Sequence, residues 1–189
     1  MKTYLSIDVD FWTDPERVWQ QLNLLMWSIG KVPVIAVMNH QQMLSSVNDS
    51  GASRLINIDE HSDLADRNVD RLECGTWISY VNWRRQGTYI WIRPKIHYYG
   101  SCNGNDWGLW NQGTDWDRSE SRYIDSKNLR VTTYLYDCVG VGLCMSPAYA
   151  IADVANVFRD IVKKYGIPYR KGLMHEKNRR MVRPSSRLE

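Results

Sequence analysis

Short apolar runs separated by longer amphipathic segments set the pattern of this chain. The runs are rich in Val, Ile, Leu and aromatic residues and predict buried strands at residues 4–9, 32–38, 55–58 and 88–93, with one or two more within 131–144. Apolar residues at helical spacing predict helices at residues 15–29, 41–47, 70–85 and 148–165. Strands that alternate with helices predict an α/β domain, here a three-layer α/β/α arrangement around a mainly parallel sheet.

The first predicted helix has clear boundary signals. Asp14 fits the N-cap, Pro15 fits the first helical position, and Gly30 follows as a terminator. This helix therefore separates two strands that we expect to be parallel.

Composition narrows the class of protein. The 189 residues are 43% hydrophobic and 24% charged with a net charge of +3, which favours one globular domain and argues against a nucleic-acid partner. No apolar stretch approaches the ~20 residues of a membrane span, and the N-terminus lacks the features of a signal peptide. We expect a cytoplasmic protein whose cysteines are free thiols: Cys74, Cys102, Cys138 and Cys144.

Side chains that commonly bind metals follow three of the predicted strands. They are Asp8, Asp10, His40, Asp59, His61 and Asp63. The carboxyl ends of parallel strands meet at one edge of a sheet, and carboxylates gathered there need a counter-charge that a divalent cation supplies. Taken singly, an aspartate pair can be a turn or helix cap, and His40 can be a satisfied polar group near the core. Together the three segments predict a metal site.

These segments resemble motifs of the arginase/ureohydrolase superfamily. The run Asp59-Glu60-His61-Ser62-Asp63 is similar to its Asp-x-His-x-Asp motif, Ser6-Ile7-Asp8-Val9-Asp10 to its Ser-x-Asp-x-Asp motif, and Asn39-His40 to its strand-ending histidine. Residues 73–78 and 90–94 look closer still to an uncharacterised arginase-like family. The resemblance covers roughly half of the chain.

The resemblance implies a dinuclear metal centre. One ion would be held by His40, Asp8, Asp59 and Asp63, and the other by His61, Asp8, Asp10 and Asp59. Oxygen-rich sites with one imidazole each favour Mn²⁺, although Fe²⁺, Co²⁺ and Zn²⁺ also suit such ligands. The ions would activate a water that attacks a guanidinium or amide carbon, and Asp63 would orient this nucleophile.

Two features depart from the superfamily's pattern. The Ser-x-Asp-x-Asp strand comes first here and last in arginases, an order that a circular permutation would explain and chance would also produce. Asn39 stands where arginases have aspartate, which would weaken the orientation of His40. The permutation requires residues 4–9 to lie beside residues 55–58 in the sheet.

Further candidates surround the predicted metals. Glu73 is the candidate general acid or base, and its alternative role is a first-turn helix carboxylate. The long segment 98–118 carries Trp107, Trp110 and Trp116 as an aromatic wall for a cationic substrate and Asp106 and Asp115 as its counter-charge. A self-packed loop is the alternative for these residues.

The chain thus predicts a single arginase-like domain at residues 1–169 and a basic, solvated tail at 170–189. The expected activity is metal-dependent hydrolysis of a non-peptide C–N bond in a small guanidino or acylated-amine compound. A metal-dependent phosphoesterase or nuclease, and a non-catalytic binding module that uses the Trp-rich segment, are the alternatives.

Overall fold

The computed structural model describes residues 1–64, 72, 75–94 and 116–170. Its strands are β1 (Thr3–Asp8), β2 (Val34–Val37), β3 (Arg54–Ile58), β4 (Thr88–Pro94), β5 (Arg118–Ile124), β6 (Cys138–Cys144) and β7 (Tyr169–Arg170). Its α-helices are α1 (Pro15–Ser28), α2 (Leu44–Asp49) and α4 (Ala152–Lys164). Short 3₁₀ turns occur at Val9–Phe11, His40–Met43, Trp77–Tyr80, Arg84–Gln86 and Val131–Tyr134.

The strands form one sheet of seven in the order β5-β4-β3-β1-β6-β2-β7, and all the pairings are parallel. Strand β1 is central, between β3 and β6, and all six of its residues are buried. Tyr4 pairs with Leu55 and Ile7 with Ile58. This confirms the predicted neighbourhood of the first and third apolar runs, and it confirms the α/β class.

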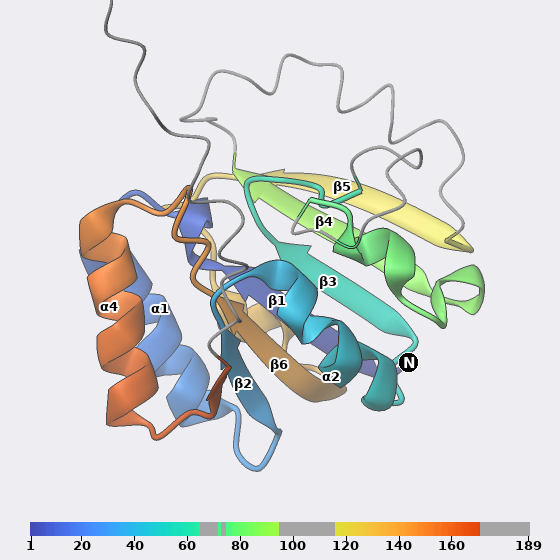
Figure 1. Ribbon diagram of the computed structural model, residues 1–189, viewed down its shortest axis with the longest axis horizontal. Helices are drawn as coiled ribbons and strands as arrows, with labels where there is room; N and C mark the ends of the chain where they lie inside the picture. The colour runs from blue at the N-terminus through green and yellow to red at the C-terminus, as the bar shows by residue number, and fades with distance from the viewer. Residues whose placement is uncertain (65–71, 73–74, 95–115, 171–189) are drawn as a thin grey trace, which may run out of the picture.

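Each face of the sheet carries its own hydrophobic cluster. On one face, Leu5, Ile7, Ile56 and Ile58 pack with residues of α1 and α4, which lie side by side in Figure 1. On the other face, Tyr4, Leu55, Tyr89 and Trp91 pack with Met43, Val47 and Trp77. The second face is thus covered by the short α2 and by 3₁₀ turns. Within the described residues, long helices pack on one face of the sheet and not on the other.

Helix α1 begins as the sequence predicts. The Asp14 side chain accepts hydrogen bonds from the backbone N–H groups of Glu16 and Arg17, and Pro15 occupies the first turn. Val18, Leu22 and Leu25 are fully buried against the sheet, which is the amphipathic pattern that stabilises a helix through tertiary packing.

Several predicted boundaries were wrong. In the described part of 70–85 the chain forms 3₁₀ turns and no α-helix, and residues 131–134 form another 3₁₀ turn before β6. The last helix begins at Ala152 and not at residue 148, because residues 146–150 form a turn. Strands β5 and β7 were not predicted: β5 is a polar, largely exposed strand and β7 has two residues.

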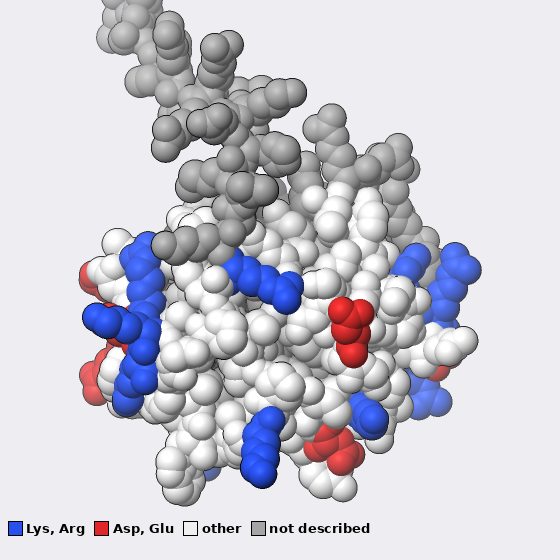
Figure 2. Space-filling view, turned by 60° about the horizontal axis from the view of Figure 1, so that its bottom comes forward, with Lys and Arg blue, Asp and Glu red and all other residues white. Residues whose placement is uncertain are grey.

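Surface charge is mixed over the face drawn in Figure 2. Basic and acidic side chains are interspersed there among wide uncharged areas, and no single-sign patch dominates the described residues of this view.

Candidate metal centre

The six candidate ligands come together beyond the carboxyl ends of β1, β2 and β3. His40 is the centre of one group: its Nδ1 lies 2.7 Å from Asp63 Oδ2, 3.2 Å from Asp59 Oδ2 and 3.4 Å from Asp8 Oδ2. These four residues are the set that the resemblance assigns to one ion.

His61 is the centre of the second group. Its Nδ1 lies 3.4 Å from Asp10 Oδ2 and 3.6 Å from Asp59 Oδ1. Asp59 therefore turns one carboxylate oxygen toward each imidazole. Two groups of three residues each place potential ligand atoms within 4.8 Å of one another: Asp10, Asp59 and His61, and His40, Asp59 and Asp63. A modest contraction would bring these atoms to the spacing that ligands have around one cation.

Local backbone structure aims these side chains at one point. Asp8 ends β1, and its Oδ1 accepts the N–H of Asp10 at 3.1 Å, so that the Val9–Phe11 turn brings Asp10 back toward the sheet edge. Asp59 Oδ1 accepts the N–H of His61 at 2.8 Å. Asp63 has a left-handed φ of 53°, a conformation that costs free energy in a non-glycine residue and concentrates at functional sites.

The convergence of Asp59, His61 and Asp63 does not come from the alternation of side chains along a strand. An extended strand would place them on one side by alternation, but β3 ends at Ile58 and the three residues follow in a turn. They meet because the turn folds back on itself.

Burial makes this cluster costly without a cation. The four aspartates and His40 are at most 5% exposed, whereas the His61 side chain is 29% exposed and marks the side open to solvent. Neither oxygen of Asp10 has a hydrogen-bond partner among the described residues, and its approach to His61 is an ion-pair contact only. A buried carboxylate without a hydrogen bond is the kind of group that a metal ion satisfies.

Burial and the proximity of the carboxylates to one another shift their pKa values. Burial, followed by the charge of Asp59, raises the pKa of both Asp10 and Asp63 to about 7. Burial and the charge of Asp10 raise the pKa of Asp8 well above its ordinary value. Burial alone would also raise the pKa of Asp59, but the charges and hydrogen bonds of His40 and His61 outweigh it and lower that pKa.

Both imidazoles are driven toward the protonated form. Burial opposes this, but for His61 the nearby carboxylates of Asp10 and Asp59 outweigh burial and raise its pKa. For His40, Cys144, Asp63, Asp8 and Asp59 together raise the pKa against burial. Without a metal, protons thus supply the positive charge that the carboxylates require.

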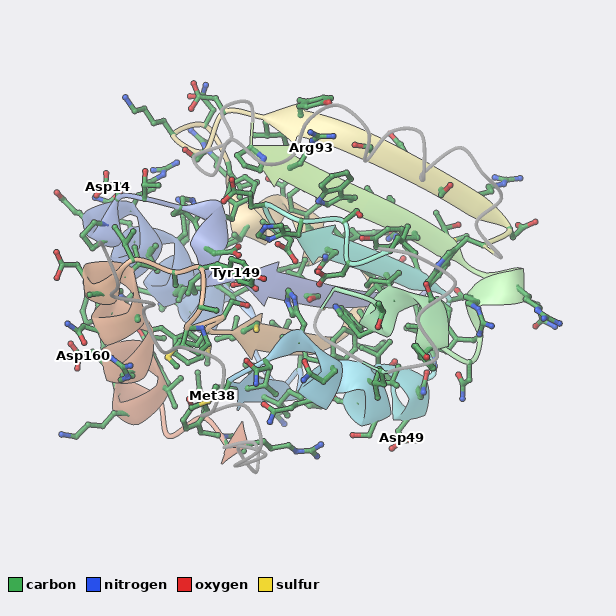
Figure 3. The ribbon with its side chains drawn as sticks, turned by 45° about the horizontal axis from the view of Figure 1, so that its top comes forward. Asp14, Met38, Asp49, Arg93, Tyr149 and Asp160 are labelled. Carbon is green, nitrogen blue, oxygen red and sulfur yellow. The ribbon has the colours of Figure 1, made fainter. Side chains whose placement is uncertain are left out.

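Several residues that sequence reasoning did not assign to the site also touch it. Trp77 Nε1 donates to Asp63 Oδ2 at 2.6 Å and its ring lies 5.4 Å from that of His40. Asn57 Nδ2 donates to Asp59 Oδ2 at 3.2 Å, and Ser146 Oγ donates to Asp8 Oδ2. The Tyr149 ring lies 4.9 Å from that of His61, and in Figure 3 it stands beyond the strand ends, between Met38 and Arg93.

The sequence offered weak signals for these residues. Asn57 is a polar residue inside an apolar run, which marks it as a partner of buried polar groups. Trp77 belongs to the segment that resembles the arginase-like family. Ser146 and Tyr149 follow a strand but are distant in sequence from their contacts, so periodicity does not reveal them.

Of the predicted aromatic wall, the structure describes Trp116, which is buried and packs its ring against those of Trp83 and Tyr89, so it belongs to the core and not to a substrate wall. Glu73, Trp107, Trp110, Asp106 and Asp115 lie outside the described residues, as does the basic segment 171–189. Of the cysteines that the structure describes, Cys138 and Cys144 are both free thiols, as expected.

Two further observations concern the chain as a whole: its capacity to cross a membrane and its similarity to known proteins. Within the described residues, no helix has the length and apolar character needed to cross a membrane. Searches of protein-family models, curated proteins and solved structures found no match to this chain.

Proposed function

We propose that this chain is a metal-dependent hydrolase with a dinuclear centre, acting on a non-peptide C–N bond as arginase-like enzymes do. The observation that carries the proposal is the position of Asp59 between two imidazoles, with Oδ2 3.2 Å from His40 Nδ1 and Oδ1 3.6 Å from His61 Nδ1. A carboxylate that faces two nitrogen ligands in this way suits a bridge between two cations.

The other ligands divide between the two positions. Asp63 and Asp8 face His40, and Asp10 faces His61. Asp8 would be the second bridge, and its Oδ1 now accepts the backbone N–H of Asp10. Mn²⁺, Fe²⁺, Co²⁺ and Zn²⁺ all suit carboxylate and imidazole ligands. Bound divalent ions lower the pKa of water and so supply a nucleophile at neutral pH.

The protein's own groups fix the ligands. Trp77 holds Asp63 Oδ2, Asn57 holds Asp59 Oδ2, and Ser146 holds Asp8 Oδ2. Outer hydrogen bonds of this kind orient ligands before the ion arrives. Asp63 accepts a hydrogen bond of 2.6 Å from Trp77, which fixes its carboxylate. We assign to Asp63 the role of orienting the nucleophile.

The activity is tested by a substrate screen with metal-loaded protein. We expect metal-dependent release of urea or an amine from a guanidino or acylated-amine compound. Replacing Glu73 by glutamine should abolish this release and leave metal content unchanged, since Glu73 is the proposed proton donor. Cleavage of phosphodiesters with no action on C–N bonds would contradict the proposal and favour a phosphoesterase, and inactivity of metal-loaded protein on every compound would favour a binding module.

Metal affinity should rise with pH. A cation must displace the protons of His40 and His61, whose pKa values are raised. Burial and the charge of Asp59 raise the pKa of Asp10 and Asp63 to about 7, so below that pH their protons must be displaced as well. The apparent affinity should fall about tenfold per pH unit for each proton displaced, as pH drops from about 8 to about 6. Calorimetry in buffers of different ionisation enthalpy counts the displaced protons. A metal affinity that does not change over this pH range would refute the expectation.

A further inference from the structure

A cysteine thiol ends the strand next to Asp8. Cys144 is the last residue of β6, it pairs with Asp8 of β1 in the sheet register, and it is 0% exposed. Cys144 belongs to the same hydrophobic cluster as Tyr4, Val37 and Met43. Its side chain therefore lies on the sheet face from which the candidate ligands project.

The two β6 positions on this face that come just before Cys144, Gly140 and Gly142, have no side chain. A Cβ at Gly140 would lie 2.7 Å from the Tyr4 ring, and a Cβ at Gly142 would lie 2.4 Å from Met43 Sδ. Tyr4 and Met43 fill the space above the two glycines, and Met43 in turn lies 3.5 Å from Ser6 Oγ. Cys144 is thus where β6 places a functional group beside the site.

The thiol is within reach of two proposed ligands. One potential ligand atom from each of Asp8, His40 and Cys144 lies within 4.8 Å of the others. Around one ion with ligand distances of about 2.0–2.3 Å, such atoms lie roughly 3.3–3.7 Å apart, so a small inward shift is sufficient. The neighbouring Asp10 carboxylate is 5% exposed and has no hydrogen bond among the described residues, which indicates independently that a cation belongs in this cluster.

Ser146 couples the thiol to the carboxylate. Its Oγ lies 3.3 Å from Cys144 Sγ and donates to Asp8 Oδ2, and its backbone has a left-handed φ of 42°. Cys144 Sγ also lies 3.7 Å from the carbonyl oxygen of Met38, to which it donates. Nearby acceptors thus hold the thiol proton in the metal-free state.

We propose that Cys144 is a ligand of the ion held by Asp8 and His40, so that this position takes a thiophilic cation of the Zn²⁺, Co²⁺ or Fe²⁺ class in preference to Mn²⁺. The inference rests on the proposed metal centre and refines it. On binding, the thiol releases its proton to solvent and the sulfur donates an electron pair to the ion. Thiolate ligands select such cations, whereas sites made of carboxylates alone suit Mn²⁺ and Mg²⁺.

Cobalt spectroscopy of the full chain tests this directly. Metal-free protein is titrated with Co²⁺, because thiolate ligation adds a near-ultraviolet charge-transfer band to the visible bands that Co²⁺ shows with oxygen and nitrogen ligands. We expect that band in the wild-type chain and in Cys138→Ser, a matched control on the same strand, and its loss in Cys144→Ser with visible bands retained. The ratio of Zn²⁺ to Mn²⁺ affinity should fall about tenfold or more in Cys144→Ser.

A second variant covers the case in which Cys144→Ser does not fold. The triple variant Cys74→Ser, Cys102→Ser, Cys138→Ser keeps Cys144 as its one thiol and should retain the charge-transfer band. Visible bands without a charge-transfer band in wild-type or triple-variant protein would overturn the inference and leave the metal centre standing. A failure of folded protein to bind Co²⁺ at all would overturn both.

Discussion

Replacing Asp59 by asparagine should abolish tight binding of both metal ions. Asp59 is fully buried, faces His40 with one oxygen and His61 with the other, and is the shared member of the two candidate ligand groups. Its loss removes a charged ligand from both positions. Loss of an outer hydrogen-bond partner lowers metal affinity about 10- to 100-fold, and we expect a larger drop here. Metal content after dialysis and titration calorimetry measure the effect.

Two variants calibrate this result. Asp49→Asn removes an exposed aspartate at the end of α2, remote from the strand ends in Figure 3, and should bind as the wild-type chain does. Asp10→Asn should weaken mainly one ion, because Asp10 contacts only His61 among the candidate imidazoles. Wild-type stoichiometry and affinity in Asp59→Asn would contradict the bridging role.

Replacing Trp77 by alanine should lower the free energy of unfolding by about 3–5 kcal/mol, the usual range for truncation of a large buried aromatic residue. Trp77 is fully buried in the cluster that covers the second face of the sheet. It also carries the donor to Asp63 and packs near His40. Denaturant unfolding of the metal-free protein measures the loss.

Trp77→Phe separates the two roles of this side chain. The ring of phenylalanine fills most of the space but lacks the Nε1–H donor, so we expect a smaller loss of about 1.5–3 kcal/mol together with weaker metal binding. Trp27→Ala is the control, since Trp27 is 83% exposed, and its effect should stay within about 0.5 kcal/mol. Unchanged metal affinity in Trp77→Phe would show that Trp77 serves the core alone.

The central strands and the candidate ligands could be predicted because both leave a strong local signal. The runs at β1, β3 and β4 are almost continuously apolar, as strands buried on both faces are. Asp14 and Pro15 mark the start of α1 by their own chemistry. The candidate ligands follow the strands directly, so the rule for parallel strand ends placed these side chains correctly at one edge.

The missed parts depend on tertiary contacts or lack a pattern. The sequence of β5, Arg-Ser-Glu-Ser-Arg-Tyr-Ile, is polar because an exposed edge strand needs no apolar face. The hydrogen bond from Ser146 to Asp8 joins residues 138 positions apart, which no local spacing reveals. The contact of Tyr149 with His61 likewise depends on the turn after β6, which the sequence suggested would already be helix.

The central place of β1 bears on the circular permutation that would explain the order of the motifs. Strand β1 lies between β3 and β6, and Asp8 and Asp59 both approach His40 Nδ1, at 3.4 Å and 3.2 Å. A chain that begins with a central strand of an arginase-like sheet would have this arrangement, because termini can be relocated at surface loops without disturbing the core. The permutation stays a prediction, and a chance similarity of the motifs stays its alternative.

Equilibrium metal binding to the wild-type chain tests the central claim most directly. Protein stripped of metal is titrated with Mn²⁺, Co²⁺ and Zn²⁺ while bound ions and thermal stability are measured. We expect two ions per chain for at least one of these metals, with stabilisation of about 4 kcal/mol for each bound ion at a free ion concentration about 1,000 times its Kd. Folded protein that binds none of the three ions, and whose melting temperature does not rise with any of them, would contradict the account.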